Sequence, residues 1–180
     1  MEDAEIIRLV LAGHHEQYAD LVQRYQEPLI HFLRHILSSE EDSLDCAQEA
    51  FLAAYRNLNR HIKEYPFRVW LYAIARNKAL DLIRKRNKEI LVMPDEALAD
   101  QQPNPEEIVL AKEQKALFSE LLHELPEQYG HALYLRYRQE LSYKEIAVVL
   151  QVPVSSVKTY LHRGKEKMRQ SLERREIRGE

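Results

Sequence analysis

The sequence is poor in cysteine, glycine and long apolar runs. A single cysteine, Cys46, excludes an intrachain disulfide and suits a reducing cytosol. Four glycines and seven prolines among 180 residues are few, which favours helices over turn-rich β folds. No apolar run reaches the roughly 20 residues that cross a bilayer, and the acidic residues 1–5 lack the basic charge that opens a signal peptide. These absences predict a soluble, cytoplasmic, all-α protein without a membrane segment.

The net charge of −3 hides a strong segregation of charge along the chain. Residues 1–60 hold five Lys and Arg against eleven Asp and Glu, whereas residues 61–90 hold eight against three. The stretch 91–128 is again acidic, with two against nine, and residues 155–178 return to eight against three. Two basic blocks in an acidic chain predict two separate contacts with a polyanion. Two ordinary solvated helix faces remain the alternative.

Apolar spacing divides the chain into two helical halves. Two helices are expected within residues 5–37, with a polar break at 13–16, a third after Ser43 and a fourth over 67–88. Beyond them, helices are expected over 110–125, after Pro126, over 142–150 and over 153–172. The segment between has no periodicity and is rich in prolines and acids. We therefore predict helical domains over 1–90 and 109–180, joined by a flexible acidic linker over 91–108.

The second half carries the pattern of a helix-turn-helix. Ser142 and Glu145 have the spacing of a capping box, the short helix they open ends near Leu150, and a second helix follows the turn at 151–153. Spacing places Val157, Leu161, Gly164 and Met168 on one inward face of that helix. In such motifs the second helix enters the major groove of DNA. The residues left outside are the predicted DNA contacts: Ser155, Ser156, Lys158, Thr159, His162, Arg163 and Lys165.

The first half offers two further candidate surfaces. The helix expected after Ser43 has an apolar stripe of Leu44, Ala47, Phe51, Ala54, Tyr55 and Leu58. Away from this stripe lies an acidic strip with one leucine, formed by Asp45, Gln48, Glu49 and Leu52. Such a strip indicates either a protein-docking face or a solvated side of the helix. The helix over 67–88 interleaves aromatic rings with cations, the chemistry of single-strand binding. Its candidate residues, with two from the preceding loop, are Lys63, Tyr65, Trp70, Tyr72, Arg76, Asn77, Lys78, Arg84 and Lys85.

Four segments in order resemble one known family. Residues 43–51, 70–81, 141–147 and 157–164, together with Leu125-Pro126, are similar to motifs of extracytoplasmic-function (ECF) RNA polymerase sigma factors, over about residues 15–172. The resemblance implies a non-catalytic initiation subunit without a cofactor. It implies that Asp45, Gln48 and Glu49 face the clamp helices of core RNA polymerase. It also implies that the basic helix meets the melted −10 element, with Lys63 and Tyr65 near an extruded base.

The second half of the chain would then read or anchor the duplex −35 element, and an anti-sigma factor is a common further partner of the family. Gln151 and Ser155 stand where the family often has glycine, while Tyr160 and Gly164 replace a common Arg and Ala. These departures concern the −35 contacts and leave the motif intact.

Other classes of protein stay open from the residues alone. A helix-turn-helix regulator that never acts as a polymerase subunit would share the second half, and a polymerase-binding protein without promoter specificity would share the docking face. No phosphate loop, catalytic triad order or paired-carboxylate motif indicates an enzyme. His31 and His35 are four residues apart and could share a metal, although a third ligand is not evident. Cys46 is expected to be a small, partly buried apolar residue rather than a redox sensor.

Overall fold

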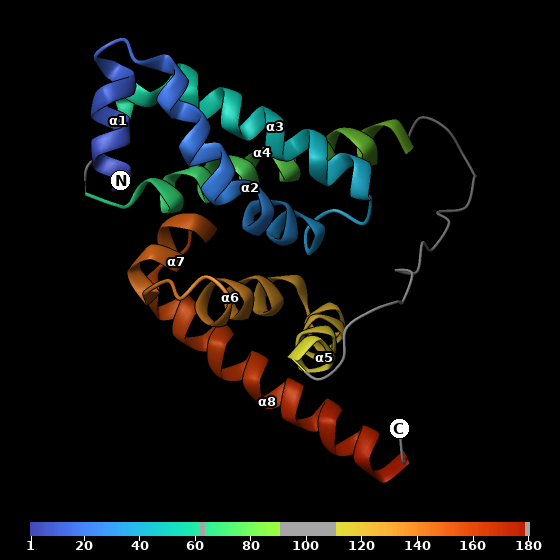
Figure 1. Cartoon of the computed structure of the whole chain (residues 1–180). Coiled ribbons are helices and arrows are strands. Elements are labelled where there is room, and N and C mark those ends of the chain that lie inside the picture. Colours follow the sequence, from blue (N-terminus) through green and yellow to red (C-terminus); the bar gives the residue numbers. More distant parts are fainter. Residues whose placement is uncertain (62–63, 91–110, 179–180) are drawn as a thin grey trace. The chain divides into compact units, whose positions relative to one another are not determined.

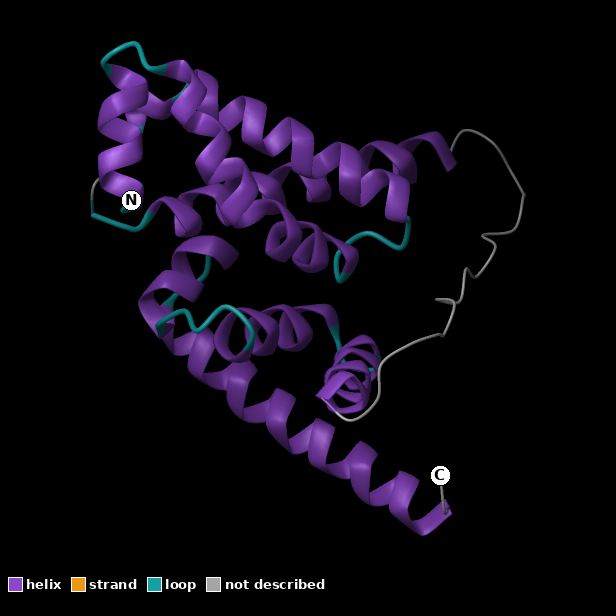
Figure 2. Ribbon diagram, in the orientation of Figure 1, coloured by secondary structure: helices purple, strands orange, loops and turns teal. Residues whose placement is uncertain are grey.

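A computed structural model describes residues 1–61, 64–90 and 111–178, and the described part of the chain is helical without strands (Figure 2). The described residues form two compact units, one built around helices α1 to α4 and the other around α5 to α8 (Figure 1). The prediction of two all-α halves is therefore confirmed. The predicted linker, 91–108, lies outside the described residues. None of the described helices is both long and apolar enough to cross a bilayer.

The first unit contains four helices and two short 3₁₀ turns. They are α1 (Asp3–Leu11), η1 (His15–Gln17), α2 (Tyr18–Arg34), α3 (Glu40–Arg56), η2 (Leu58–Arg60) and α4 (Phe67–Ile90). Helix α3 packs against both α2 and α4, and α2 also contacts α4. The three helices enclose a core whose largest members include Leu21, Leu29, Phe32, Phe67 and Leu71, each at most 1% exposed. Figure 1 shows α3, in cyan, running beside α2, in blue.

Helix α3 begins earlier than predicted. The sequence suggested a start after Ser43, but Ser39 is the N-cap and its Oγ accepts a hydrogen bond from the Asp42 backbone N at 3.2 Å. The acids Glu40, Glu41 and Asp42 then occupy the first turn, where negative charge is favourable beside the helix dipole. The residues before Ser43 therefore form the N-cap and the first turn of the helix.

The second unit contains α5 (Ala111–His123), α6 (Glu127–Tyr137), α7 (Tyr143–Leu150) and α8 (Val154–Arg178). Helix α8 packs mainly on α6 and touches α5. It runs six residues beyond the predicted end at 172. In this added stretch, the Arg175 guanidinium donates to Glu120 at 3.1 Å and to Glu124 at 2.5 Å, which ties the end of α8 to α5. These partners are over fifty residues away in sequence, so local spacing could not reveal them.

Candidate docking face and nucleic-acid interface

The predicted docking face on α3 is exposed to solvent. Buried residues of this helix, Cys46, Ala47, Ala50 and Phe51, turn toward the core, while Asp45, Gln48, Glu49 and Leu52 all lie outside. Leu52 is 53% exposed. An apolar side chain kept in water at this level contributes little to folding, so it is available to a partner.

A groove between α2 and α3 adjoins this docking face. It has a volume of about 770 Å³ and takes in Gln48 and Leu52 from the docking face, with Val22 and Tyr18 from α2. Leu44 also borders the groove and is 39% exposed. The sequence placed Leu44 on the apolar stripe of this helix, and the structure leaves this part of the stripe partly exposed in the groove. Leu44 and Leu52 therefore both contribute apolar surface to the groove.

Helix α4 presents cations on its outer side. Asn77, Arg84 and Lys85 are exposed, whereas Arg76 and Lys78 are half-buried. The rows of α4 that face α2 and α3 carry Leu71, Ala75 and Ala79, each fully buried. The helix therefore has a core side that carries these buried residues and an outer side that carries the exposed cations.

The two aromatic residues predicted to contact nucleic acid on α4 have different environments. Trp70 is half-buried. Tyr72 is only 2% exposed, and its ring lies 5.1 Å from that of Phe32 on α2. A ring enclosed in the core cannot stack on a base without unfolding its surroundings. The structure therefore contradicts the assignment of Tyr72 to the nucleic-acid surface, because Phe32 of α2 covers its ring.

Two ion pairs link α3 to cations of α4, and one of them involves the docking face. Lys78 Nζ lies 3.0 Å from Glu49 Oε2. The Arg86 guanidinium forms a bidentate salt bridge with the Asp42 carboxylate, with both N–O distances at 2.6 Å. Lys78 and Glu49 were predicted to serve two different partners, and they bind each other in the free chain. A pair as exposed as Lys78–Glu49 contributes about 0–1 kcal/mol, so little free energy is lost when a partner replaces it.

The segment before α4 is organised by aromatic rings. The ring centroids of His61 and Trp70 are 5.3 Å apart, and each lies 6.1 Å from the ring of Phe67. The His61 Nε2–H group donates to the Tyr65 carbonyl at 3.2 Å. Burial lowers the pKa of His61 and so favours the neutral imidazole. Tyr65 is half-buried, and the predicted contact Lys63 lies outside the described residues.

The helix-turn-helix has the predicted capping box. The Ser142 backbone N donates to Glu145 Oε2 at 2.7 Å, and the Glu145 backbone N donates to Ser142 Oγ at 3.2 Å. At the other end of α7, the Val152 N donates to the Ala147 carbonyl at 3.1 Å, which is the long bond of a Schellman motif. The residue that such a motif holds in the left-handed region is Gln151, with φ of +54°. The turn that the family often builds with glycine is therefore present here with glutamine.

Helix α8 exposes the residues predicted to contact DNA. Val157 and Leu161 are at most 2% exposed. On the remaining sides, Ser155, Lys158, Thr159, His162, Arg163 and Lys165 are exposed and Ser156 is half-buried. Gly164 is buried against α6, and a Cβ on it would lie 2.8 Å from Leu133 Cδ1. The common alanine at this position would therefore require Leu133 to move.

Comparison with known proteins assigns both halves to one family. The model of sigma-70 region 2 matches residues 21–89, and that of sigma-70 region 4 matches residues 115–168. The ECF RNA polymerase sigma factor SigW of Bacillus subtilis is 33% identical over 177 residues, covering 92% of this chain and 94% of SigW. The chain belongs to the ECF family of RNA polymerase sigma factors. The sigma-H factor of Pseudomonas aeruginosa is 30% identical, over 96% of this chain and 94% of its own length.

Solved structures share the fold of this sigma factor. CnrH, in a complex with the cytosolic domain of CnrY, has a TM-score of 0.69 at 24% identity, covering 95% of this chain and 97% of CnrH. The sigma factor RpoE from Bartonella quintana, in a complex with the anti-sigma factor NepR, has a TM-score of 0.65 at 19% identity, covering 86% of this chain and 97% of RpoE. The family models place the docking face and the cations of α4 within region 2, and the helix-turn-helix within region 4.

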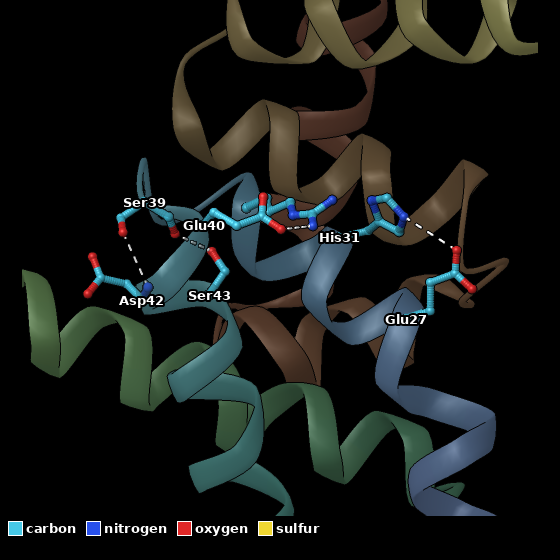
Figure 3. A network of polar contacts seen from close by, with 7 residues as sticks. Glu27, His31, Ser39, Glu40, Asp42 and Ser43 are labelled. Atoms are coloured by element: carbon cyan, nitrogen blue, oxygen red, sulfur yellow. Dashed lines mark hydrogen bonds and ion pairs between the residues drawn. The ribbon is translucent and has the colours of Figure 1, made fainter. Parts of the chain in front are cut away.

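The histidines considered as metal ligands have other surroundings in this sigma factor. Figure 3 shows His31 beside Glu27 on α2, with His31 Nε2 lying 3.8 Å from Glu27 Oε1. One turn along, Arg34 pairs with Glu40, next to the Ser39 cap of α3. Among the described residues, no cluster of three His, Cys, Asp or Glu side chains has the arrangement of a metal site.

Cys46 lies in the core of region 2. It is 6% exposed, and its Sγ lies 3.6 Å from the Ala75 carbonyl of α4. Burial raises the pKa of the Cys46 thiol to about 11. A thiol is nucleophilic only as the thiolate, so this residue packs as a small apolar group.

Proposed function

We propose that this sigma factor binds core RNA polymerase through the docking face on α3 and directs initiation by contacting the −10 and −35 elements of its promoters. The observation that carries the proposal is the exposure of three separate polar surfaces on two small units. The docking face is acidic with an exposed leucine, the outer side of α4 is cationic, and the first turns of α8 are small and polar, then basic. One chain with these three surfaces fits one protein partner and two DNA elements.

The proposed −10 surface is formed by α4 and the turn before it. Its residues are exposed or half-buried: Tyr65 in the turn and Trp70, Arg76, Asn77, Lys78, Arg84 and Lys85 on the helix. Exposed cations bind the phosphates, and a partly exposed indole can stack on an unpaired base. Lys63 completes the set as a prediction from the sequence.

The −35 contact draws on α8. Ser155 and Ser156 lie at the N-terminal tip, the part of a recognition helix that reaches base edges. Lys158, Arg163 and Lys165 follow with positive charge for the phosphates. The folded capping box and Schellman turn hold this helix in place before DNA is met.

Two broader assignments follow from family membership. We propose that the chain acts as a non-catalytic specificity subunit in the cytoplasm, where the polymerase transcribes DNA. We also propose an anti-sigma factor as a regulatory partner, because two structural relatives were solved with CnrY and with the anti-sigma factor NepR. The test for the partner is an excess of the candidate protein added before or after core polymerase, with inhibition expected only when it is added first.

Run-off transcription tests the main proposal. Purified full chain and bacterial core polymerase are incubated with genomic fragments, and RNA 5′ ends are mapped. Discrete start sites that core alone does not make are expected. Asp45→Lys is expected to abolish them by loss of core binding, whereas Glu41→Lys, an exposed acid of the same helix outside the docking face, retains them. Promoter-specific DNA binding with no new start sites would favour the regulator instead.

A further inference from the structure

One side chain of region 2 touches two of the proposed −10 contacts. His61 follows η2 and precedes α4, and its imidazole lies 5.3 Å from the Trp70 indole between ring centroids. The same imidazole bonds through Nε2 to the Tyr65 carbonyl at 3.2 Å. Tyr65 lies in the turn before α4 and Trp70 lies in the first turn of α4. The imidazole therefore contacts both sides of the N-terminus of this helix.

The bond to Tyr65 constrains the backbone more than a packing contact does. It closes a ring from residue 61 to residue 65, just before Pro66. The Pro66 carbonyl in turn accepts the Val69 N at 3.0 Å, which begins α4. The side chain of His61 thus holds the peptide at Tyr65, and the ring of Pro66 fixes its own φ directly before α4. The orientation of the Tyr65 side chain then depends on His61.

Burial, and not the surrounding charge, favours the neutral form of His61. Burial is the main cause of its lowered pKa, whereas the hydrogen bond to the Tyr65 carbonyl and, to a smaller extent, the Asp3 carboxylate of α1 act in the opposite direction. That carboxylate is itself bonded to the Arg24 guanidinium and the Tyr25 hydroxyl of α2. A neutral imidazole with hydrogen on Nε2 can donate to the carbonyl and still pack its ring on Phe67 and Trp70.

We propose that His61 is a positioning residue for the −10 contact, which holds the Tyr65 backbone by its hydrogen bond and the Trp70 indole by ring packing in the geometry that receives the unpaired strand. The proposal rests on the proposed −10 function of α4. The sequence already associates His61 with the loop before the basic helix, and only the fold shows that its imidazole touches both Tyr65 and Trp70.

Three variants separate the contributions of His61. His61→Phe keeps an aromatic ring but loses the donor, and His61→Gln keeps an N–H group near the position of Nε2. His14→Gln is the matched control, because His14 is 60% exposed in its side chain and lies outside the proposed contacts. Each full-length variant is combined with core polymerase on a template mapped by run-off transcription and opened in advance over the −10 element. The measured quantity is the affinity for the unpaired strand, beside the affinity for core.

We expect His61→Phe to bind the opened template about three- to tenfold more weakly, the loss that corresponds to one net hydrogen bond. We expect His61→Gln to remain within about twofold of wild type, and both to bind core normally. If His61→Phe binds the opened template as tightly as wild type does, or loses as much affinity for core, the positioning role is wrong. Start sites made by wild type would in that case still support the sigma function. Absence of start sites with wild type would overturn the proposed function, and the positioning role with it.

Fluorescence gives a readout on the free chain that a merely structural residue would not move. Trp70 is the one tryptophan of the sequence, and a protonated imidazole in contact with an indole quenches its emission. When the pH is lowered, the Trp70 emission of wild type and of His14→Gln should fall. The midpoint of this fall should lie below the usual histidine pKa of about 6.5. In His61→Phe this titration should vanish. A titration that persists in His61→Phe would show that the ring contact with Trp70 is absent in solution, which overturns the proposal.

Discussion

Gln151 provides a quantitative test of how the helix-turn-helix is built. Its φ of +54° lies in the left-handed region, and the Schellman bonds around it leave no alternative conformation without losing the turn. A side chain with a Cβ costs about 1–2 kcal/mol in this region, a cost that glycine avoids. Glycine also raises the entropy of the unfolded chain, which removes about 0.5–1 kcal/mol of that gain. Gln151→Gly should therefore stabilise the second unit by about 0.5–1 kcal/mol.

The assay is thermal unfolding of the full chain by calorimetry, with hydrogen exchange of the α7 and α8 amides to assign the transition to the second unit. A gain of this size corresponds to about 2–8 °C in Tm for a unit of fewer than 100 residues. Lys167→Gly is the matched control, because Lys167 is exposed in the regular part of α8. There glycine should lower stability by about 1 kcal/mol. If Gln151→Gly lowers Tm as Lys167→Gly does, the reasoning from backbone geometry is refuted.

Five further outcomes are expected. Trp70→Ala should weaken binding of the unpaired −10 strand by about 1–3 kcal/mol in a fluorescence-anisotropy titration. Tyr72→Ala should instead lower the free energy of unfolding by about 3–5 kcal/mol. A Tyr72→Ala chain that stays fully folded but has a specific DNA-binding defect would contradict the place of Tyr72 in the core. Leu52→Asp should reduce core polymerase affinity at least about tenfold while its Tm stays near wild type, so a large loss of Tm would show that Leu52 is structural. Lys158→Ala should reduce the slope of log affinity against log salt by about 0.9 on −35 duplex, and an unchanged slope would remove Lys158 from the phosphate contacts. Cys46 should react slowly with an alkylating reagent at pH 8 and rapidly in denaturant, because burial raises its pKa to about 11; equal rates would show that the core of region 2 is open.

Much of the helical framework could be predicted from short-range signals. The capping box at Ser142 and Glu145 depends on two residues three positions apart, and the structure contains both of its hydrogen bonds. The exposed face of α8 could be predicted in the same way, since Val157 and Leu161 repeat with the helix period and fix the side that turns inward. Such patterns are legible because the interacting groups lie within one or two turns of each other.

The errors arise where a second helix decides the environment. Tyr72 and Trp70 are two residues apart on one helix, and both looked suitable for stacking on bases. Phe32 of α2 covers Tyr72, whereas Trp70 stays partly exposed. Leu44 belongs to the apolar stripe of α3 and is nevertheless 39% exposed, because it borders the groove between α2 and α3. Periodicity states which residues share a face and is silent on how far the neighbouring helix extends over it.

The sequence by itself determined an all-α chain of two halves, a helix-turn-helix in the second, and the candidate surfaces for polymerase and DNA, because composition, helix period and caps are local properties. The tertiary structure alone decided which candidates are exposed, that Lys78 pairs with Glu49, and that His61 braces Tyr65 and Trp70. These contacts depend on how side chains from separate segments pack at close range. Packing of that kind is set by the whole fold, since a covering helix can come from any distance along the chain.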